Sequence, residues 1–264
     1  MTGARIGTLA TLRGRIERIE TLGDAHGLNR VALGHAGADA MLRGGLAVAA
    51  VHEVFAEGRQ GAVATGFIAG LAGRITRRRP LVWVRQDFSD IESGALSMSG
   101  LSELGLDPRH VVSVRAADVD SALRSAADAL ACEALGAVVL EVLGEARQLD
   151  LVASRKLTLA AQASGVTALL LRIAATPIPS TAETRWIVRA AHSPPGSVFS
   201  AWGAPLFDVE LVRNRHGPVG RWIMEWKCDE CLFFEPSAYP QPVAAAPAYR
   251  PHQAAIGREQ RRAG

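Results

Sequence analysis

The residues with the clearest chemical meaning lie between Gly44 and Ala72, where a buried strand, a glycine-containing loop and a helix are expected in succession. Phosphate-binding loops have this layout, and their pattern GxxxxGK followed by Ser or Thr supplies amides and a lysine to phosphates and a hydroxyl to Mg²⁺. The corresponding stretch runs from Ala56 to Val63, where Gly61 matches but Ala62 replaces the lysine and Val63 the hydroxyl. We therefore expect a degenerate loop that binds no nucleotide cofactor; an ordinary strand, turn and helix that never bound one is the alternative.

Two further groups of side chains could bind a ligand. Cys228 and Cys231 form a CxxC pair, but a zinc site normally needs four ligands, so we expect two structural cysteines and no metal site. A redox pair, or a zinc site shared with a partner, is the alternative. Arg77, Arg78 and Arg79 follow an expected helix whose C-terminal dipole favours cations. They are also candidate contacts for nucleic acid or an acidic partner.

The composition is that of a globular protein with a sizeable core. The chain has 264 residues, of which 48% are hydrophobic, and a net charge of +3 that by itself indicates no partner. Three cysteines make no disulfide framework in a chain of this length. The sequence contains no secretory segment and no apolar run of about 18 residues. We expect a cytoplasmic protein that does not enter the membrane.

Short apolar runs alternate with helical patterns through the middle of the chain, which predicts an α/β fold with a mostly parallel sheet and helices on both faces. Gly136 and Gly165 are expected to end helices in the left-handed conformation. The last third predicts strands without helices between them and an antiparallel edge hairpin. The expected strands are 50–55, 81–84, 111–114, 137–142, 167–171, 186–190, 207–213 and 220–226, and the expected helices are 65–77, 119–135 and 151–164.

The two ends of the chain differ from this central part. Residues 4–22 predict an amphipathic helix, followed from Gly23 to about Gly45 by a linker rich in Gly and Ala. Residues 236–264 are rich in Pro, Ala and Arg and predict a disordered tail. We divide the chain into a helix and linker (1–43), a core (44–235) and the tail. The apolar side of the helix is a candidate partner-binding surface, formed by Leu9, Leu12, Ile16 and Ile19.

The order of these segments resembles the RecA family. GGL before a strand that ends in HEVF resembles the start of the RecA core, and LVWVRQD (81–87) its second strand, with Asp87 near the family's catalytic glutamate. Residues 105–144 resemble the units that lead through the Walker B strand, in which Glu141 replaces the usual aspartate. Residues 155–172 resemble the RKL helix and the strand after it, which ends in Leu170, Leu171 and Arg172 where the family has a polar sensor segment. With the closing hairpin (207–226) they complete a resemblance over about residues 44–226. The resemblance implies a RecA-like core without a functional Walker A loop.

The two DNA-binding loops of that family look short in this sequence. They correspond to about Leu143–Ala153 and Ala174–Glu183, and the second contains Pro177 and Pro179 but little basic character. A protein that grips single-stranded DNA needs cations along the backbone track. We therefore expect neither recombinase nor ATPase activity, and contact with DNA that is weak or indirect.

A core of this length without a phosphate loop is similar to the ImuA family of bacterial damage-inducible mutagenesis proteins. GGLAVAAVHEVF and VRNRHGPVGRWIMEW support this resemblance best. It implies a non-enzymatic accessory protein in SOS-induced, error-prone translesion synthesis. The implied partners are an ImuB-like Y-family polymerase homologue, an error-prone C-family polymerase and, as a further candidate, RecA. The alternatives are a SulA-like inhibitor of cell division and an active RecA-like ATPase with an unorthodox nucleotide site.

Overall fold

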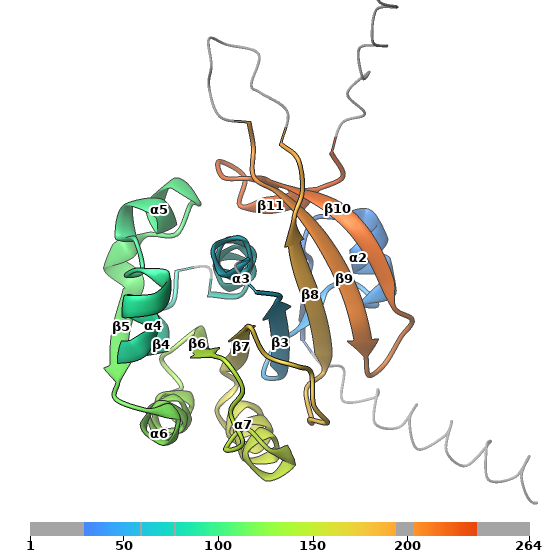
Figure 1. Ribbon diagram of the computed structural model, residues 1–264. Helices are drawn as coiled ribbons and strands as arrows, with labels where there is room; N and C mark the ends of the chain where they lie inside the picture. The colour runs from blue at the N-terminus through green and yellow to red at the C-terminus, as the bar shows by residue number, and fades with distance from the viewer. Residues whose placement is uncertain (1–28, 59, 77, 194–202, 237–264) are drawn as a thin grey trace, which may run out of the picture.

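The computed structural model describes residues 29–58, 60–76, 78–193 and 203–236, and its main feature is a nine-stranded sheet (Figure 1). Six neighbouring strands are parallel and three at one side are antiparallel. From the antiparallel side the order is β11 (Leu232–Phe234), β10 (Gly220–Lys227), β9 (Leu206–Asn214), β8 (Thr184–Ala190), β3 (Val51–Ala56), β7 (Thr167–Ile173), β6 (Ala137–Leu143), β4 (Leu81–Gln86) and β5 (Val111–Ala116). The predicted α/β class with a mostly parallel sheet is confirmed.

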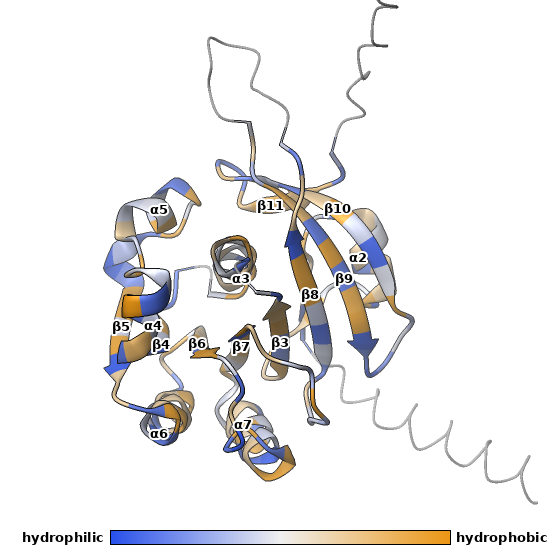
Figure 2. Ribbon diagram, viewed as in Figure 1, coloured by the Kyte–Doolittle hydropathy of each residue, from blue (hydrophilic) through white to orange (hydrophobic). Residues whose placement is uncertain are grey.

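The central strands are buried on both faces, which explains their nearly continuous apolar sequences. Every residue of β3, β4 and β7 is buried, and these strands are largely orange in the hydropathy view (Figure 2). By contrast β5, at the end of the sheet, has a single buried residue, Ala116. The sites described below lie at the ends of the central strands.

Helices cover both faces of the sheet, as predicted. On one face lies α3 (Gly61–Thr76), with α2 (Ala36–Met41) and α5 (Met98–Glu103) beside it. Phe67 of α3 packs against Trp186, Phe207 and Phe233, with ring centroids 5.2–5.9 Å apart. On the other face lie α6 (Val119–Leu130) and α7 (Leu151–Ser164), which enclose a second core cluster. The short helices α4 (Asp87–Ser93) and η1 (Pro108–His110) complete this part of the fold.

The prediction of a linker between Gly23 and Gly45 is wrong for those of its residues that the structure describes. There β1 (Arg30–Val31) pairs with β2 (Leu46–Ala47), and α2 lies between them, begun by the His35 side chain, which accepts from the amide of Ala38. The small residues permit close packing: a Cβ on Gly45 would lie 2.2 Å from the carbonyl oxygen of Val31. Three leucines of this segment are completely buried: Leu33, Leu42 and Leu46.

The two glycines expected to end helices have different roles. Gly165 ends α7 in the left-handed conformation, with φ +76°, as predicted. Gly136 does not end a helix, because α6 stops at Leu130. It lies against Thr76 instead, where a Cβ would come within 2.7 Å of the Thr76 Cα. The structure thus requires Gly136 for close packing between α3 and β6.

The predicted antiparallel edge is present and longer than expected. Strand β8 runs parallel to β3, and β9 turns back along it before the β9–β10 hairpin. The sequence did not predict β11, which pairs with β10 and buries Phe233. Within the described residues no helix is both long and apolar enough to cross a membrane.

Candidate functional site

The segment that resembles a degenerate phosphate loop lies between β3 and α3, at the carboxyl ends of the parallel strands. Gly61 is the first residue of α3 and is buried. A Cβ at Gly61 would lie 3.2 Å from the Cδ1 atom of Ile173, at the end of β7. Ala62 is exposed, and Val63 packs against the core. The first turn of α3 therefore offers neither a cation nor a hydroxyl at positions 62 and 63.

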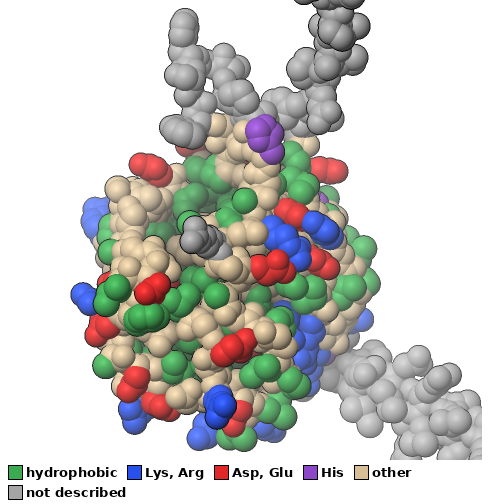
Figure 3. Space-filling view, viewed as in Figure 1, with side chains coloured by type: hydrophobic (Ala, Val, Ile, Leu, Met, Phe, Trp, Pro, Cys, Tyr) green, Lys and Arg blue, Asp and Glu red, His purple; other side chains and the backbone are tan. Residues whose placement is uncertain are grey.

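A cavity of about 520 Å³ adjoins this loop. Its described lining contains one acidic residue, Glu92, and no Lys or Arg; the lining residues are Gly58, Gly61, Ala62, Glu92, Ser93, Leu143 and Ile173. Figure 3 shows the molecule in the view of Figure 1, with hydrophobic and uncharged side chains over much of the centre of the surface and charged side chains of both signs scattered among them. The described lining thus offers no positive charge to a triphosphate, because its one charged residue is acidic.

Glu141, which occupies the Walker B position of the RecA resemblance, is engaged by its neighbours. Its two carboxylate oxygens accept from Trp83 Nε1 at 2.9 Å and from an Arg85 nitrogen at 2.9 Å. Arg85 also pairs with Asp90 of α4 at 2.7 Å. Glu141 and Arg85 are 1% and 4% exposed. The carboxylate thus joins β6, β4 and, through Arg85, α4, and each of its oxygens accepts a hydrogen bond from a buried neighbour.

Asp87 lies outside this buried group. It begins α4 at the end of β4, is about half exposed, and pairs with Arg115 of β5 at 2.9 Å. The group of three or more His, Cys, Asp or Glu side chains that a metal would need does not occur among the described residues.

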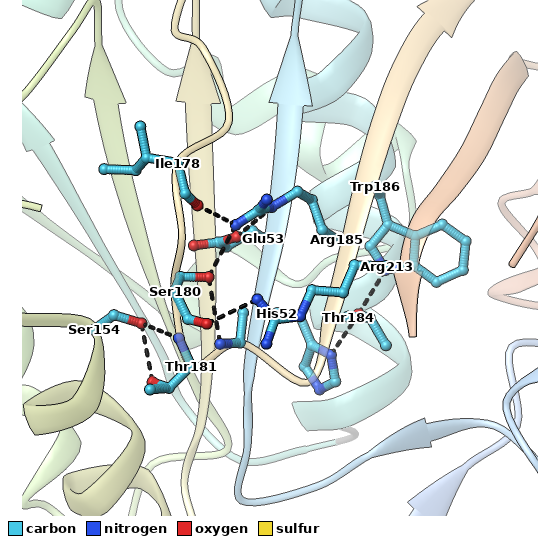
Figure 4. A network of polar contacts seen from close by, with 11 residues as sticks. His52, Glu53, Ser154, Ile178, Ser180, Thr181, Thr184, Arg185, Trp186 and Arg213 are labelled. Carbon is cyan, nitrogen blue, oxygen red and sulfur yellow. Dashed lines mark hydrogen bonds and ion pairs between the residues drawn. The ribbon is translucent and has the colours of Figure 1, made fainter. Parts of the chain in front are cut away.

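A second polar network lies between β3, β8 and the segment that joins β7 to β8 (Figure 4). Arg185 donates from Nε to Glu53 at 2.7 Å, and its Nη2 donates both to the Ile178 carbonyl at 2.5 Å and to the Ser180 hydroxyl at 3.0 Å. Arg213 donates to the Ser180 carbonyl at 2.7 Å. These contacts hold residues 174–183 against the sheet.

Arg172 lies beside this network and is 2% exposed. Its guanidinium lies 5.7 Å from the centre of the Phe55 ring, and that of Arg185 lies 5.5 Å from the same ring. Burial lowers the pKa of Arg172 from its ordinary value, and the charges of Glu53 and Glu145 oppose this effect. Leu170, Leu171 and Arg172, which stand where the RecA resemblance places a polar sensor segment, are all buried.

The two segments that resemble DNA-binding loops are short. Residues 144–150 join β6 to α7, and residues 174–183 join β7 to β8. The Glu145 carboxylate accepts from the amide of Thr176 at 2.7 Å, which joins the two segments, and Ser154 of α7 accepts from the amide of Thr181 at 2.9 Å. Residues 174–183 contain no Lys or Arg. This edge therefore lacks the row of cations that a nucleic-acid backbone requires.

The arginine run lies at the opposite end of α3. Arg79 donates to the carbonyls of Glu133 and Ala134, and Arg78 is exposed. Both line a cavity of about 580 Å³ at the amino ends of β4 and β5, which also includes Arg109 and His110. Sequence reasoning did not single out Arg109 or His110, because they are separated from the run by about thirty residues of chain. Arg77 and the candidate partner-binding residues Leu9, Leu12, Ile16 and Ile19 lie outside the described residues.

Cys228 and Cys231 lie in the turn between β10 and β11, the last strand on that side of the sheet. Both pack against the core that includes α3. The Cys231 thiol donates to the Cys228 carbonyl at 3.3 Å, and burial raises the pKa of Cys228. A thiol with a raised pKa is a poor nucleophile. The contacts therefore support a structural role.

The ion pair of Glu53 and Arg185 was likewise not predicted from the sequence. Its sequence signal was a charged residue inside a strand expected to be buried, since such a residue needs a partner.

Relatives of this chain are found among curated proteins but not among family models. No family model matches the sequence. Two curated proteins from Caulobacter vibrioides, of strains NA1000 / CB15N and ATCC 19089 / CIP 103742 / CB 15, are each called "Protein ImuA". Each is 31% identical to this chain over 197 residues, a match that covers 69% of this chain and 77% of the relative.

Proposed function

The chain belongs to the ImuA family, and on that premise we propose that it is a non-catalytic accessory protein in SOS-induced, error-prone translesion DNA synthesis. It acts in the cytoplasm through a core derived from RecA that no longer uses ATP. Its partners are an ImuB-like Y-family polymerase homologue and an error-prone C-family polymerase, with RecA as a further candidate. Its contact with DNA is weak or indirect.

One observation supports the non-catalytic role above the others: the first turn of α3 presents Ala62 to a cavity whose only charged lining residue in the described chain is Glu92, while Val63 packs against the core. A nucleotide would bring several negative charges to a place whose described lining offers no cation, and Arg85 of an adjoining pocket is already paired with Glu141 and Asp90. Each charge-assisted hydrogen bond that is missing removes about 1.5–3 kcal/mol of binding free energy. The occupied carboxylate of Glu141 supports the same conclusion for the metal.

The match to ImuA relatives favours this role over that of a SulA-like division inhibitor. It extends over about three quarters of the length of those relatives. The loops at the carboxyl ends of β6 and β7 are short, and hydrogen bonds hold them to each other, to α7 and to β9. A core of this shape suits a protein that acts by binding partners on its surface.

The test combines genetics with a pull-down. Deletion of the gene is expected to lower the frequency of damage-induced mutations to the level of unexposed cells, with normal filamentation and recovery of division. The tagged full-length chain, recovered from damaged cells, is expected to bring down the polymerase components. Unchanged mutagenesis after deletion, or recovery of the tubulin-like division protein in place of polymerases, would refute the proposal.

A further inference from the structure

The cavity at the amino ends of β4 and β5 is distinct from the degenerate phosphate loop, which lies at the carboxyl ends of the strands. It has a volume of about 580 Å³ and is bordered by the last turn of α3, the start of β5 and η1. Among Lys, Arg, Asp and Glu, its described lining contains four arginines and one aspartate: Arg74, Arg78, Arg79, Arg109 and Asp107. We name it the basic cleft.

The single acid of the basic cleft does not offset all of its arginines. Asp107 is bound by Arg109, whose Nε and terminal nitrogens lie 2.8–3.2 Å from the carboxylate oxygens. These hydrogen bonds lower the pKa of Asp107 to about 2, so it is ionised and its charge is committed to Arg109. Arg79 is held in place by two neutral carbonyls, and Arg78 is exposed without a carboxylate partner among the described residues. The cleft therefore has positive charge available for an anion.

The surroundings of the basic cleft limit the length of that anion. Asp229 and Glu230 immediately precede Cys231, which lines the cleft, and both are exposed. Glu133, whose carbonyl holds Arg79, is exposed, as is Glu103 near Leu106. A nucleic-acid backbone would extend past the arginines and meet these carboxylates, where like charges repel it. The described lining also contains no Phe, Tyr or Trp on which an unpaired base could stack.

We propose that the basic cleft binds a short acidic segment of a partner protein, whose carboxylates pair with Arg78 and Arg79. Guanidinium groups bind carboxylates with two parallel hydrogen bonds, and Arg79 is already oriented by its carbonyl contacts. Leu106 and Val111 of the lining provide apolar contact beside the charges. The exposed carboxylates around the cleft confine the occupant to a segment with one or two carboxylates and repel a longer polyanion. They belong to Glu103, Glu133, Asp229 and Glu230. The proposal does not depend on the mutagenesis role.

The test measures, by fluorescence anisotropy, binding of the full chain to a short fluorescein-labelled, amidated peptide that carries two Glu residues separated by Leu. The same peptide with Gln in place of both Glu residues, and fluorescein-labelled single-stranded and duplex DNA, are the comparison probes. The Glu peptide is expected to bind more tightly than all of them and to lose affinity as salt is added. Absence of binding by the Glu peptide, or equal binding by the Gln peptide, overturns the proposal.

Arg78→Glu is expected to weaken binding of the Glu peptide about tenfold, because one charge-assisted contact becomes a repulsion. The matched control is Arg155→Glu, an exposed arginine on α7 across the sheet, for which we expect less than about a twofold change. Arg79→Gln provides a second variant, and a thermal melt of each confirms the fold. Equal effects of Arg78→Glu and Arg155→Glu overturn the proposal. Tighter binding of DNA, lost in Arg78→Glu, assigns the cleft to nucleic acid and overturns it as well.

Discussion

Arg185 of β8 and Glu53 of β3 form an ion pair between neighbouring parallel strands, with 2.7 Å between Nε and the carboxylate (Figure 4). Both side chains are largely buried, with 12% and 6% of their surfaces exposed. The same guanidinium holds the carbonyl of Ile178 and the hydroxyl of Ser180. The pair therefore fixes the connection between β7 and β8 to the sheet.

Glu53→Gln is expected to lower the free energy of unfolding by about 3–5 kcal/mol, because it leaves the buried charge of Arg185 without its carboxylate. The measurement is equilibrium unfolding in urea. Asp208→Asn is the matched control, since it removes a carboxylate from Arg221, which is 58% exposed, and should cost about 0–1 kcal/mol. A loss for Glu53→Gln no larger than that of the control contradicts the prediction.

We expect His52 to make the folded state sensitive to acid. Burial lowers its pKa to about 4 from an ordinary value of 6.5, while its ring is hydrogen-bonded to Thr184 and the Ala47 carbonyl at 2.8 Å. Below pH 6.5 the unfolded chain binds a proton that the folded chain does not, so stability should fall as the pH falls. The loss should be complete below about pH 4 and amount to about 3 kcal/mol.

The measurement is the free energy of unfolding between pH 7 and pH 4. His52→Gln is expected to be less stable at pH 7 but to have a shallower slope over this interval. His110→Gln, at an exposed position, should keep the slope of the parent protein. A slope that is unchanged by His52→Gln shows that another group causes the acid sensitivity.

Restoring the two missing residues of the phosphate loop should not restore nucleotide binding. In Ala62→Lys/Val63→Thr the cavity still contains Glu92, Leu143 and Ile173, and the Glu141 carboxylate is still held by Trp83 and Arg85. We expect the dissociation constant for Mg-ATP, measured by isothermal titration calorimetry, to stay above about 1 mM. This corresponds to a binding free energy weaker than about 4 kcal/mol. Micromolar binding would show that positions 62 and 63 alone removed the site.

Two glycines of α3 provide a paired test of the packing under the antiparallel strands. A Cβ on Gly70 would lie 2.7 Å from Phe233 Cζ and 3.2 Å from two atoms of the Trp226 ring. Gly70→Ala is expected to cost about 1–3 kcal/mol of unfolding free energy, because both rings are buried and cannot yield easily. On Gly66 the nearest atom would be 3.5 Å away, an ordinary contact.

Gly66→Ala is therefore expected to stabilise the protein by up to about 1 kcal/mol, because alanine loses less conformational entropy in a helix. Thermal and urea unfolding of both variants measure the difference. If the two substitutions change stability in the same direction, β11 does not pack on α3 as described.

The parallel strands were predictable because burial on both faces makes their sequences apolar throughout. The observed ends of β3 and β6 lie within about one residue of the predicted ones. The linker prediction failed for a physical reason: Gly and Ala between residues 30 and 47 permit close packing, as at Gly45, and composition alone does not distinguish this from flexibility. Gly136 shows the same ambiguity between a turn and a close approach.

Some of the candidate sites could likewise be predicted from the sequence and others could not. Loss of the phosphate loop follows from residue types at fixed spacing, so Ala62 and Val63 could be read from the sequence. The basic cleft joins Arg78 and Arg79 to Arg109, which lies on a different element, and the ion pair of Glu53 joins residues 132 positions apart. Such groups are defined by tertiary contacts, which periodicity and spacing do not contain.

The packing of Gly61 against Ile173, with Leu143 beside it, decides what a new ATP site at this position would demand. A lysine, a hydroxyl, a smaller side chain at the end of β7 and a freed carboxylate at Glu141 would all be needed. Freeing Glu141 would by itself cost stability, because Arg85 would stay buried without that partner. An engineered nucleotide site in this protein therefore calls for several simultaneous substitutions, whereas its exposed surfaces accept change one residue at a time.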